Sequence, residues 1–362
     1  MLKAREAVRT LPAYHPPLEG RDGLRLDFNE NTVGCSPRVL ERLRQLSPQQ
    51  LAKYPERGPI EVKLAEFLGI SPPELLLTNG VDEAIHLLCG TYLDAGDEAL
   101  IIVPTYSMYR IYMMAAGAEV VAIPAGSNFQ FPVEDLCKRI TGRTRLIVIA
   151  NPNNPTGSVA REDELLRIAH MAPAAAMLVD EAYFDFYGQS VLPKGRGLQN
   201  LFVARTFSKA YGLAGLRVGA LVCDPDQMLA VRRVSSPYSV NAVALACLHD
   251  AIDDQAYVSE YVSEIRESRR SLEHVLDGAG IRFWPSQANF VLARVSSSRA
   301  GAAAFVDRMR RRGVLVRDRS GDHGCEGCVR ITLGPRKHTD RLLTALQETM
   351  KELGIVQGAM RL

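Results

Sequence analysis

The sequence predicts an α/β protein in which a mostly parallel, seven-stranded sheet is sandwiched by helices and a smaller α+β domain follows. Seven short apolar runs alternate with amphipathic helical patterns through the first three quarters of the chain, which is typical of parallel sheets covered on both faces. The pattern changes beyond Ile281. The length of 362 residues also suits one large domain with a smaller one beside it.

The apolar runs and helical patterns of the first part follow one another in a regular order. The runs expected to form buried strands are 74–78, 99–103, 120–124, 145–150, 176–180, 201–205 and 218–223. The helices expected between most of them are 81–92, 106–116, 133–140, 161–171 and 225–234, and a longer helix is expected over about 253–279. Apolar runs of this length, set between helical patterns, indicate strands buried within a sheet.

Beyond residue 281 the pattern predicts a smaller α+β unit. Strand patterns at 288–295, 314–317 and 328–333 accompany helical patterns at 298–312 and 337–353. The first forty residues hold no complete strand–helix unit, so we expect them to pack against this C-terminal part. The predicted division is a large domain over 40–275 and a small domain over 276–362, with residues 1–39 packed against the small one.

Composition and charge exclude several classes of protein. Forty-three basic and forty-one acidic residues are interspersed and leave a net charge of +2, so no basic field is available for nucleic acid or an anionic membrane. Residues 1–17 lack the apolar core of a signal peptide, and no run approaches the roughly 20 apolar residues of a membrane span. Seven cysteines spread along the chain are typical of reduced thiols. We therefore expect a cytoplasmic enzyme acting on small molecules.

Lys209 is the candidate nucleophile. It follows an apolar strand and precedes a glycine-containing turn, within Arg-Thr-Phe-Ser-Lys-Ala-Tyr-Gly at 205–212. A lysine at the edge of a core is desolvated, which lowers its pKa and makes it a usable Schiff-base nucleophile. Most of the eight lysines have helical or charged neighbours, and for them a solvated ammonium is the simpler interpretation.

Asp180 ends a predicted buried strand and is the candidate partner of Lys209. Open α/β folds place ligands at the carboxyl ends of strands. A carboxylate there can keep a pyridine nitrogen protonated, so that the ring accepts electrons, and Tyr183 is positioned to donate to a ring oxygen. The competing interpretation is that Asp180 caps a helix or forms a structural ion pair. It would be preferred if Lys209 did not follow 29 positions later in the sequence.

Two turns after predicted strands offer further ligands. Residues 151–157, Asn-Pro-Asn-Asn-Pro-Thr-Gly, form a rigid turn, and its position near the other candidates makes a ligand role for Asn154 attractive. The segment 75–84 runs from a strand through Gly80 into a helix, where free N–H groups and the helix dipole favour a phosphate. Ser208 and Arg217 would complete that cradle. The sequence has no G-x-G-x-x-G or Walker A run, which disfavours dinucleotides and nucleoside triphosphates.

The run His-Gly-Cys-Glu-Gly-Cys at 323–328 has the appearance of a metal or redox hairpin. His323, Cys325 and Cys328 supply three soft ligands, yet no second pair of ligands lies at zinc-finger spacing. We therefore expect a loop that leads into the strand at 328–333, and no metal site.

Taken together, these segments resemble the fold type I aminotransferases of class II, which depend on pyridoxal 5'-phosphate, and most closely the histidinol-phosphate aminotransferase family. The matching text is collinear and spans nearly the whole chain, at 26–31, 54–55, 79–85, 104–109, 151–157, 179–183, 206–219, 314–318 and 329–334. A departure lies at 32–35, Thr-Val-Gly-Cys, where the family commonly has a proline and an aromatic residue on the substrate side.

The resemblance implies roles at matching positions. Lys209 would hold the cofactor as a Schiff base and then move a proton, while Asp180 would pair with the ring nitrogen. The other cofactor contacts implied are Asn154 and Tyr183 at the phenolic oxygen, Tyr106 against the ring, and Val81, Asp82, Ser208 and Arg217 at the phosphate.

The resemblance also implies a partner and a substrate site. Tyr54 would reach the cofactor phosphate of a neighbouring subunit, which implies a homodimer with shared active sites. Arg330 would bind the anionic end of the substrate, with Arg317, Tyr14 and Asn31 nearby. The implied reaction uses an amino donor and an oxo-acid acceptor, and the preferred one converts L-histidinol phosphate and 2-oxoglutarate to imidazole-acetol phosphate and L-glutamate, a step of histidine biosynthesis.

Three alternatives remain at this point. The nearest is an aromatic amino-acid aminotransferase with the same machinery. A second is a decarboxylase of a phosphorylated amino acid that uses the same cofactor. A transcription regulator built on this fold is disfavoured, because neither terminus has the room or the basic charge for a helix-turn-helix.

Overall fold

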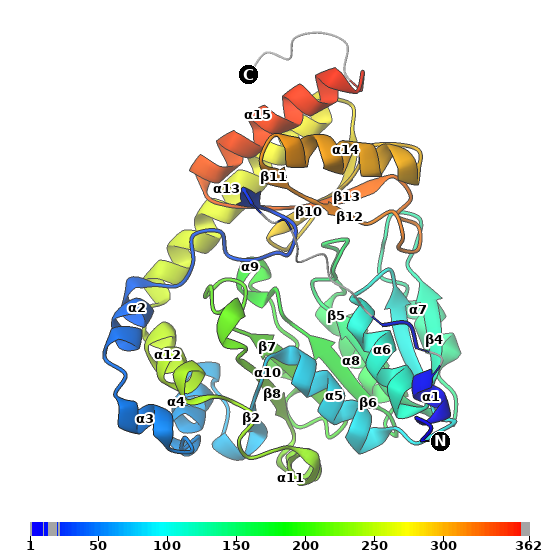
Figure 1. The fold of residues 1–362 in the computed structure, drawn as a ribbon. Coiled ribbons are helices and arrows are strands. Elements are labelled where there is room, and N and C mark those ends of the chain that lie inside the picture. The colour runs from blue at the N-terminus through cyan, green and yellow to red at the C-terminus, as the bar shows by residue number, and fades with distance from the viewer. Residues whose placement is uncertain (1, 10, 14–19, 21, 356–362) are drawn as a thin grey trace.

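The computed structural model describes residues 2–9, 11–13, 20 and 22–355, and its main feature is a seven-stranded sheet (Figure 1). The strands are β2 (Leu75–Thr78), β3 (Glu98–Val103), β4 (Glu119–Pro124), β5 (Thr144–Ala150), β6 (Ala176–Asp180), β7 (Leu201–Thr206) and β8 (Gly219–Cys223). Their order across the sheet is β2-β8-β7-β6-β5-β3-β4. Strand β8 is antiparallel to β2 and β7, whereas the other pairs are parallel. This confirms the predicted sheet.

The apolar runs of the sequence form strands because both faces of the sheet are covered. In β2, Leu75 and Leu77 belong to the core on one face, and Leu76 belongs to the core on the other. Every residue of β6, β7 and β8 is buried, as is typical of central strands in such a sheet. Strand β4, at the edge, is mostly exposed or half-buried, and only Ile123 in it is buried.

Helices cover the two faces of the sheet. Those expected from the sequence are α5 (Val81–Tyr92), α6 (Ser107–Ala116), α7 (Val133–Arg139), α8 (Glu162–Met171), α11 (Pro225–Val234) and α13 (Gln255–Gly278). Those not expected are α1 (Glu6–Arg9), α2 (Pro37–Arg44), α3 (Pro48–Ala52), α4 (Gly58–Leu68), α9 (Phe184–Tyr187), α10 (Leu192–Gly195) and α12 (Ala242–Asp253). None of the helices in the described residues is both long and apolar enough to cross a membrane.

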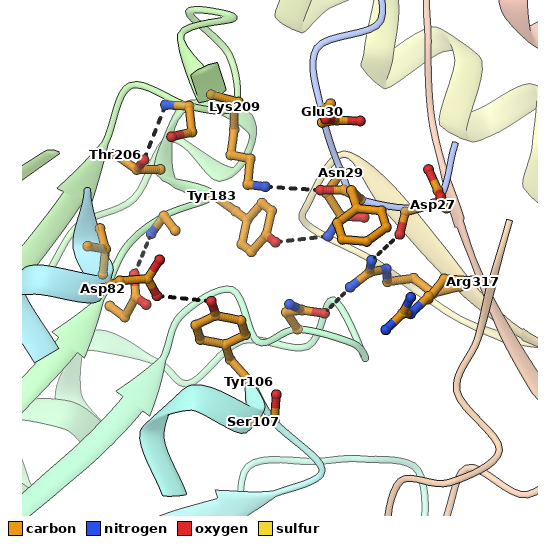
Figure 2. Close-up of a pocket in the computed structure, with 18 of the residues that line it drawn as sticks. Asp27, Asn29, Glu30, Asp82, Tyr106, Ser107, Tyr183, Thr206, Lys209 and Arg317 are labelled. Atoms are coloured by element: carbon orange, nitrogen blue, oxygen red, sulfur yellow. Dashed lines mark hydrogen bonds between the residues drawn. The ribbon is translucent and has the colours of Figure 1, made fainter. Parts of the chain in front are cut away.

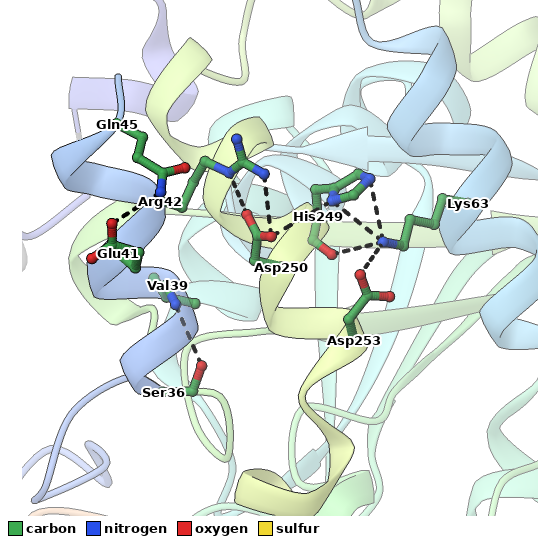
Figure 3. Close-up of polar contacts among 9 residues, drawn as sticks. All are labelled: Ser36, Val39, Glu41, Arg42, Gln45, Lys63, His249, Asp250 and Asp253. Carbon is green, nitrogen blue, oxygen red and sulfur yellow. Dashed lines mark hydrogen bonds and ion pairs between the residues drawn. The ribbon is translucent and has the colours of Figure 1, made fainter. Parts of the chain in front are cut away.

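Polar contacts attach the N-terminal helices to α12, which packs against both α2 and α4. On α2, Arg42 donates from Nε and Nη2 to the two carboxylate oxygens of Asp250, at 2.5 and 3.3 Å. On α4, the Nζ of Lys63 lies 2.7 Å from Oδ2 of Asp253. Figure 3 shows these two bridges side by side on one surface of α12. They fix the segment that precedes the large sheet.

The C-terminal part forms a second layer above the large sheet in Figure 1. Its elements are β9 (Arg282–Trp284), β10 (Phe290–Arg294), α14 (Arg299–Arg311), β11 (Val314–Leu315), β12 (Arg317–Asp318), β13 (Cys328–Thr332) and α15 (Arg336–Glu352). Four of its strands form an antiparallel sheet in the order β12-β13-β10-β9.

The single strand predicted at 314–317 is wrong, because the chain changes sheets at Val316. Strand β11 pairs in parallel with β1 (Leu24–Arg25), and β12 pairs with β13. The N–H of Leu26 also donates to the carbonyl of Leu315 at 2.8 Å. Val314, Leu315 and Val316 are apolar without interruption, so the sequence carries no sign of the break at Val316.

Candidate active site

The carboxyl ends of the central strands and the N-terminus of α5 meet at one cavity of about 360 Å³. This volume lies within the range of small-molecule and cofactor sites. The predicted site residues that line it are Val81, Asp82, Tyr106, Asn154, Asp180, Tyr183, Ser208, Lys209, Arg217, Arg317 and Arg330. Figure 2 shows side chains of the N-terminal segment, the large sheet and the C-terminal part facing one another across it.

Lys209 lies on the turn after β7, and its side chain crosses the cavity toward the N-terminal segment (Figure 2). Its Nζ donates to the backbone carbonyl of Phe28 at 3.1 Å and lies 6.0 Å from the centre of the Tyr183 ring. Burial, followed by the positive charge of Arg330, lowers the pKa of Lys209 to about 8. An appreciable share of the amine is therefore unprotonated near neutral pH, as nucleophilic attack requires.

Asp180 ends β6 as a buried carboxylate at the same cavity. Its Oδ2 accepts a hydrogen bond from the hydroxyl of Tyr109 at 2.6 Å, and its Oδ1 accepts one from the N–H of Ala182 at 3.0 Å. Burial raises the pKa of Asp180 to about 6, and these two hydrogen bonds oppose the rise. A carboxylate held in this way can receive a positively charged N–H group.

The N-terminus of α5 forms one end of the cavity, with Gly80 as its N-cap residue. Gly80 has φ 75°, and a Cβ there would lie 2.6 Å from Nη2 of Arg217. Glycine therefore lets the guanidinium approach the first turn of the helix. The same Nη2 lies 2.9 Å from Oδ2 of Asp82, whose Oδ1 accepts from the Tyr106 hydroxyl at 2.9 Å. Free N–H groups, the helix dipole and Arg217 together suit a phosphate.

Three arginines of the C-terminal part line another side of the cavity. Arg317 and Arg330 are paired across β12 and β13, so their side chains share one face of the small sheet. Arg330 donates from Nη1 to Oδ1 of Asn154 at 2.5 Å and from Nη2 to the carbonyl of Asp27 at 2.7 Å. Burial and the charges of Arg319 and Arg317 lower the pKa of Arg330 to about 10. Positive charges gathered this closely favour an anion.

The N-terminal segment contacts Tyr183, as Figure 2 shows. Asn29, which has φ 56°, donates from Nδ2 to the hydroxyl of Tyr183 at 2.8 Å. Its N–H donates to Oγ1 of Thr332 at 3.0 Å. Because the Tyr183 hydroxyl accepts here, its own proton remains available for an acceptor in the cavity.

Two predicted site residues in the described part of the chain, Asn31 and Tyr54, do not line the cavity. Asn31 donates from Nδ2 to the carbonyl of Ala210 at 3.0 Å and accepts from two N–H groups of its own turn. The resemblance implied a place near the substrate, whereas the side chain binds the backbone. Tyr54 is 78% exposed and packs on Tyr238, with ring centres 4.4 Å apart. Tyr14 lies outside the described residues.

Among the cavity residues that were not predicted, Tyr109 and Arg319 each had a signal in the sequence. Tyr109, in the first turn of α6, lies three positions after Tyr106, the N-cap residue of that helix, and their rings meet edge to face at 5.5 Å. Arg319 lies two positions after Arg317, just beyond the end of β12, where period-two alternation in strands would keep both on one face. Arg319 also bridges Asp322 at 2.5 Å.

The cysteine-containing run forms a turn, as predicted. The N–H of Cys328 donates to the carbonyl of Cys325 at 2.9 Å, and both residues are buried, whereas His323 is exposed. Within the described part of the chain, no three histidine, cysteine or acidic residues gather closely enough to hold a metal ion.

With this geometry in place, comparison with known proteins identifies the family. The family model for aminotransferase class I and II matches residues 21–346. The chain belongs to this family. A histidinol-phosphate aminotransferase of Geobacillus sp. (strain WCH70) is 33% identical over 98% of this chain and 100% of its own length, and one of Caldanaerobacter subterraneus subsp. tengcongensis is 35% identical over 90% of this chain and 93% of its own.

A solved structure is similar over nearly the whole aminotransferase. It is the histidinol-phosphate aminotransferase of Sinorhizobium meliloti in complex with pyridoxal-5'-phosphate, with a TM-score of 0.90 and 26% identity, covering 98% of this chain and 99% of that one. The chain is therefore a fold type I aminotransferase that uses pyridoxal 5'-phosphate. The donor set agrees, because a lysine of lowered pKa, a buried carboxylate and an arginine at a helix N-terminus line one cavity.

Proposed function

We propose that this aminotransferase converts L-histidinol phosphate and 2-oxoglutarate to imidazole-acetol phosphate and L-glutamate. The observation that carries the proposal is the group of three arginines, Arg317, Arg319 and Arg330, on one side of the cavity. A phosphate monoester carries more negative charge than a carboxylate and offers more oxygens to guanidinium forks. The relatives that are 33% and 35% identical carry the same name, which supports this choice of substrate.

The proposed roles of the residues follow from their contacts. Bound pyridoxal 5'-phosphate supplies an electron sink for the bond broken at the substrate Cα. The Nζ of Lys209 would hold the cofactor and, as a free amine, would accept the proton that this Cα loses. Asp180 pairs with the ring nitrogen, while Tyr183 and Asn154 contact the phenolic oxygen.

In this proposal the cofactor phosphate and the anionic group of the substrate bind at different sides of the cavity. The cofactor phosphate would be held by the N–H groups of Val81 and Asp82, by Ser208 and by Arg217. Tyr106 stacks on the ring. The substrate anion is bound by the three arginines, and Arg330 is kept in place by its two hydrogen bonds to the protein.

The same site must bind two substrates in turn, glutamate and a phosphate ester. Arg330 presents a planar fork that suits a carboxylate and a phosphate equally well. Comparing kcat/KM for histidinol phosphate and for phenylalanine, each with 2-oxoglutarate, tests the proposed substrate. We expect histidinol phosphate to be preferred by orders of magnitude. A strong preference for phenylalanine would instead assign the chain to the aromatic amino-acid aminotransferases.

We further propose that the enzyme is a homodimer and that Tyr54 completes the partner's cofactor site. Tyr54 and Tyr238 are 78% and 57% exposed, and Leu51 and Val234 nearby in sequence are at least half exposed, which is unusual for large apolar side chains unless another surface covers them. Sedimentation should give a dimer, and Tyr54→Phe should weaken cofactor binding more than Tyr238→Phe. A monomer with full cofactor affinity would contradict the proposal.

A further inference from the structure

The carboxylate of Asp180 has a partner that none of the roles above includes. Tyr109, on α6, is 1% exposed, and its hydroxyl lies 2.6 Å from Oδ2 of Asp180. The other carboxylate oxygen accepts only the N–H of Ala182 among the hydrogen bonds recorded for the described residues. Tyr109 is thus the side chain that orients this carboxylate.

Tyr109 can act only as a donor in this contact. Burial and the negative charge of Asp180 raise the pKa of Tyr109 well above its ordinary value, so the phenol keeps its proton throughout the working pH range. The hydrogen bond favours the ionised form of Asp180 and opposes the increase in the carboxyl pKa that burial causes. Without it, the pKa of Asp180 would lie above about 6, closer to neutral pH.

The state of Asp180 decides which atom holds the proton that it shares with a pyridine nitrogen. When the carboxylate is the weaker base, the proton stays on the nitrogen, and the positively charged ring accepts electrons. When the pKa of the carboxyl increases, the same proton moves to its oxygen and leaves the ring neutral. An uncharged ring accepts electrons less well.

We propose that Tyr109 is a positioning residue that holds Asp180 ionised and aimed at the cofactor's ring nitrogen, so that this nitrogen stays protonated. The inference rests on the proposed pairing of Asp180 with that nitrogen. Tyr109 itself needs no contact with the substrate, and it acts through the carboxylate. Tyr106, the proposed ring-stacking residue, precedes α6 as its N-cap and contacts the Tyr109 ring edge to face, so the two side chains lie together at the start of this helix.

The test uses the holoenzyme reconstituted with cofactor labelled with ¹⁵N in the ring. The ¹⁵N chemical shift reports directly whether the nitrogen is protonated, whatever the turnover rate. We expect a pyridinium signal in the parent enzyme from about pH 6 to 9, and a shift toward neutral pyridine in Tyr109→Phe within that range. Tyr112→Phe is the matched control, because it deletes a phenol from the same helix without a recorded contact to Asp180. It should give the parent signal.

Asp180→Asn separates failure of this inference from failure of the underlying pairing. If Asp180→Asn changes the ¹⁵N shift but Tyr109→Phe does not, Asp180 pairs with the ring and the role of Tyr109 is wrong. If neither variant changes the shift, the proposed pairing itself is wrong.

A second measurement covers the case in which Tyr109→Phe holds too little cofactor for spectroscopy. Cofactor dissociation constants are compared for the parent, both single variants and the double variant. If Tyr109 acts through Asp180, Tyr109→Phe alone should weaken cofactor binding about tenfold, which corresponds to a change of about one unit in the carboxyl pKa. Added to Asp180→Asn, the same substitution should have little further effect on cofactor binding. Equal losses in both backgrounds would overturn the inference.

Discussion

Replacing Arg330 with lysine tests the proposed anion site, because it retains the charge but removes the planar fork. Arg330 already donates from two nitrogens to Asn154 and Asp27, and these bonds fix its direction. The single ammonium group of a lysine cannot replace the hydrogen bonds to Asn154 and Asp27 and also bind a substrate anion. Losing one charge-assisted hydrogen bond costs about 1.5–3 kcal/mol, and about 1.4 kcal/mol corresponds to a tenfold change in rate. We therefore expect kcat/KM for histidinol phosphate to decrease about 10- to 150-fold.

The assay follows glutamate formation from histidinol phosphate and 2-oxoglutarate, with bound cofactor measured by its visible absorbance. The matched control is Arg269→Lys: Arg269, on α13, is half-buried and donates to the carbonyl of Ala288 at 3.1 Å, but it does not line the cavity. It should keep nearly full kcat/KM. A decrease of less than about threefold in Arg330→Lys, or an equal decrease in both variants, would refute the reasoning, since the energy of one lost bond sets the expected scale.

Three further variants test other parts of the site. Asp180→Asn should retain some cofactor yet lower kcat by orders of magnitude, because a neutral amide no longer favours the charged ring; an unchanged kcat would count against the pairing. Lys209→Met should stabilise the free enzyme toward urea by up to about 3 kcal/mol at pH 7, because burial lowers the pKa of Lys209 from 10.5 to about 8 and the folded state disfavours the charge. This gain is complete below pH 8 and disappears by about pH 10.5, so a less stable variant at pH 7 would contradict it. Gly80→Ala should weaken cofactor binding at least tenfold, because its φ of 75° and the nearby Arg217 leave no room for a methyl group; equal dissociation constants would show that the cradle adapts.

The sheet and its flanking helices could be predicted because burial on both faces leaves continuous apolar runs. Strands β5, β6 and β7 carry this signal, and the site residues at their ends follow from the rule that ligands bind at the carboxyl edge. Helix α12 was missed: apolar residues dominate it and six of its residues are buried, so it lacks a clear polar face. The division of 314–317 into two strands depends on pairing with β1, almost 300 residues away in sequence.

The chemistry of the site could be predicted from residue types, whereas the contacts between its residues could not. Lys209 and Asp180 carry groups whose function depends on position at strand ends, and these positions are local in sequence. The partner of Asp180 is a residue 71 positions earlier, and only the packing of α6 against the sheet brings Tyr109 to it. For Asn31 the residue type was misleading, because its side chain accepts hydrogen bonds from the backbone of its own turn and does not reach the cavity.

The most direct test of the account is to identify the amine that binds the cofactor. Borohydride reduction of the holoenzyme fixes the covalent bond between pyridoxal 5'-phosphate and the protein, and peptide mass spectrometry then locates the modified residue. We expect a single phosphopyridoxyl group on Lys209 and none in Lys209→Ala. Labelling of any other lysine in the parent enzyme, or equal labelling in the variant, would contradict it.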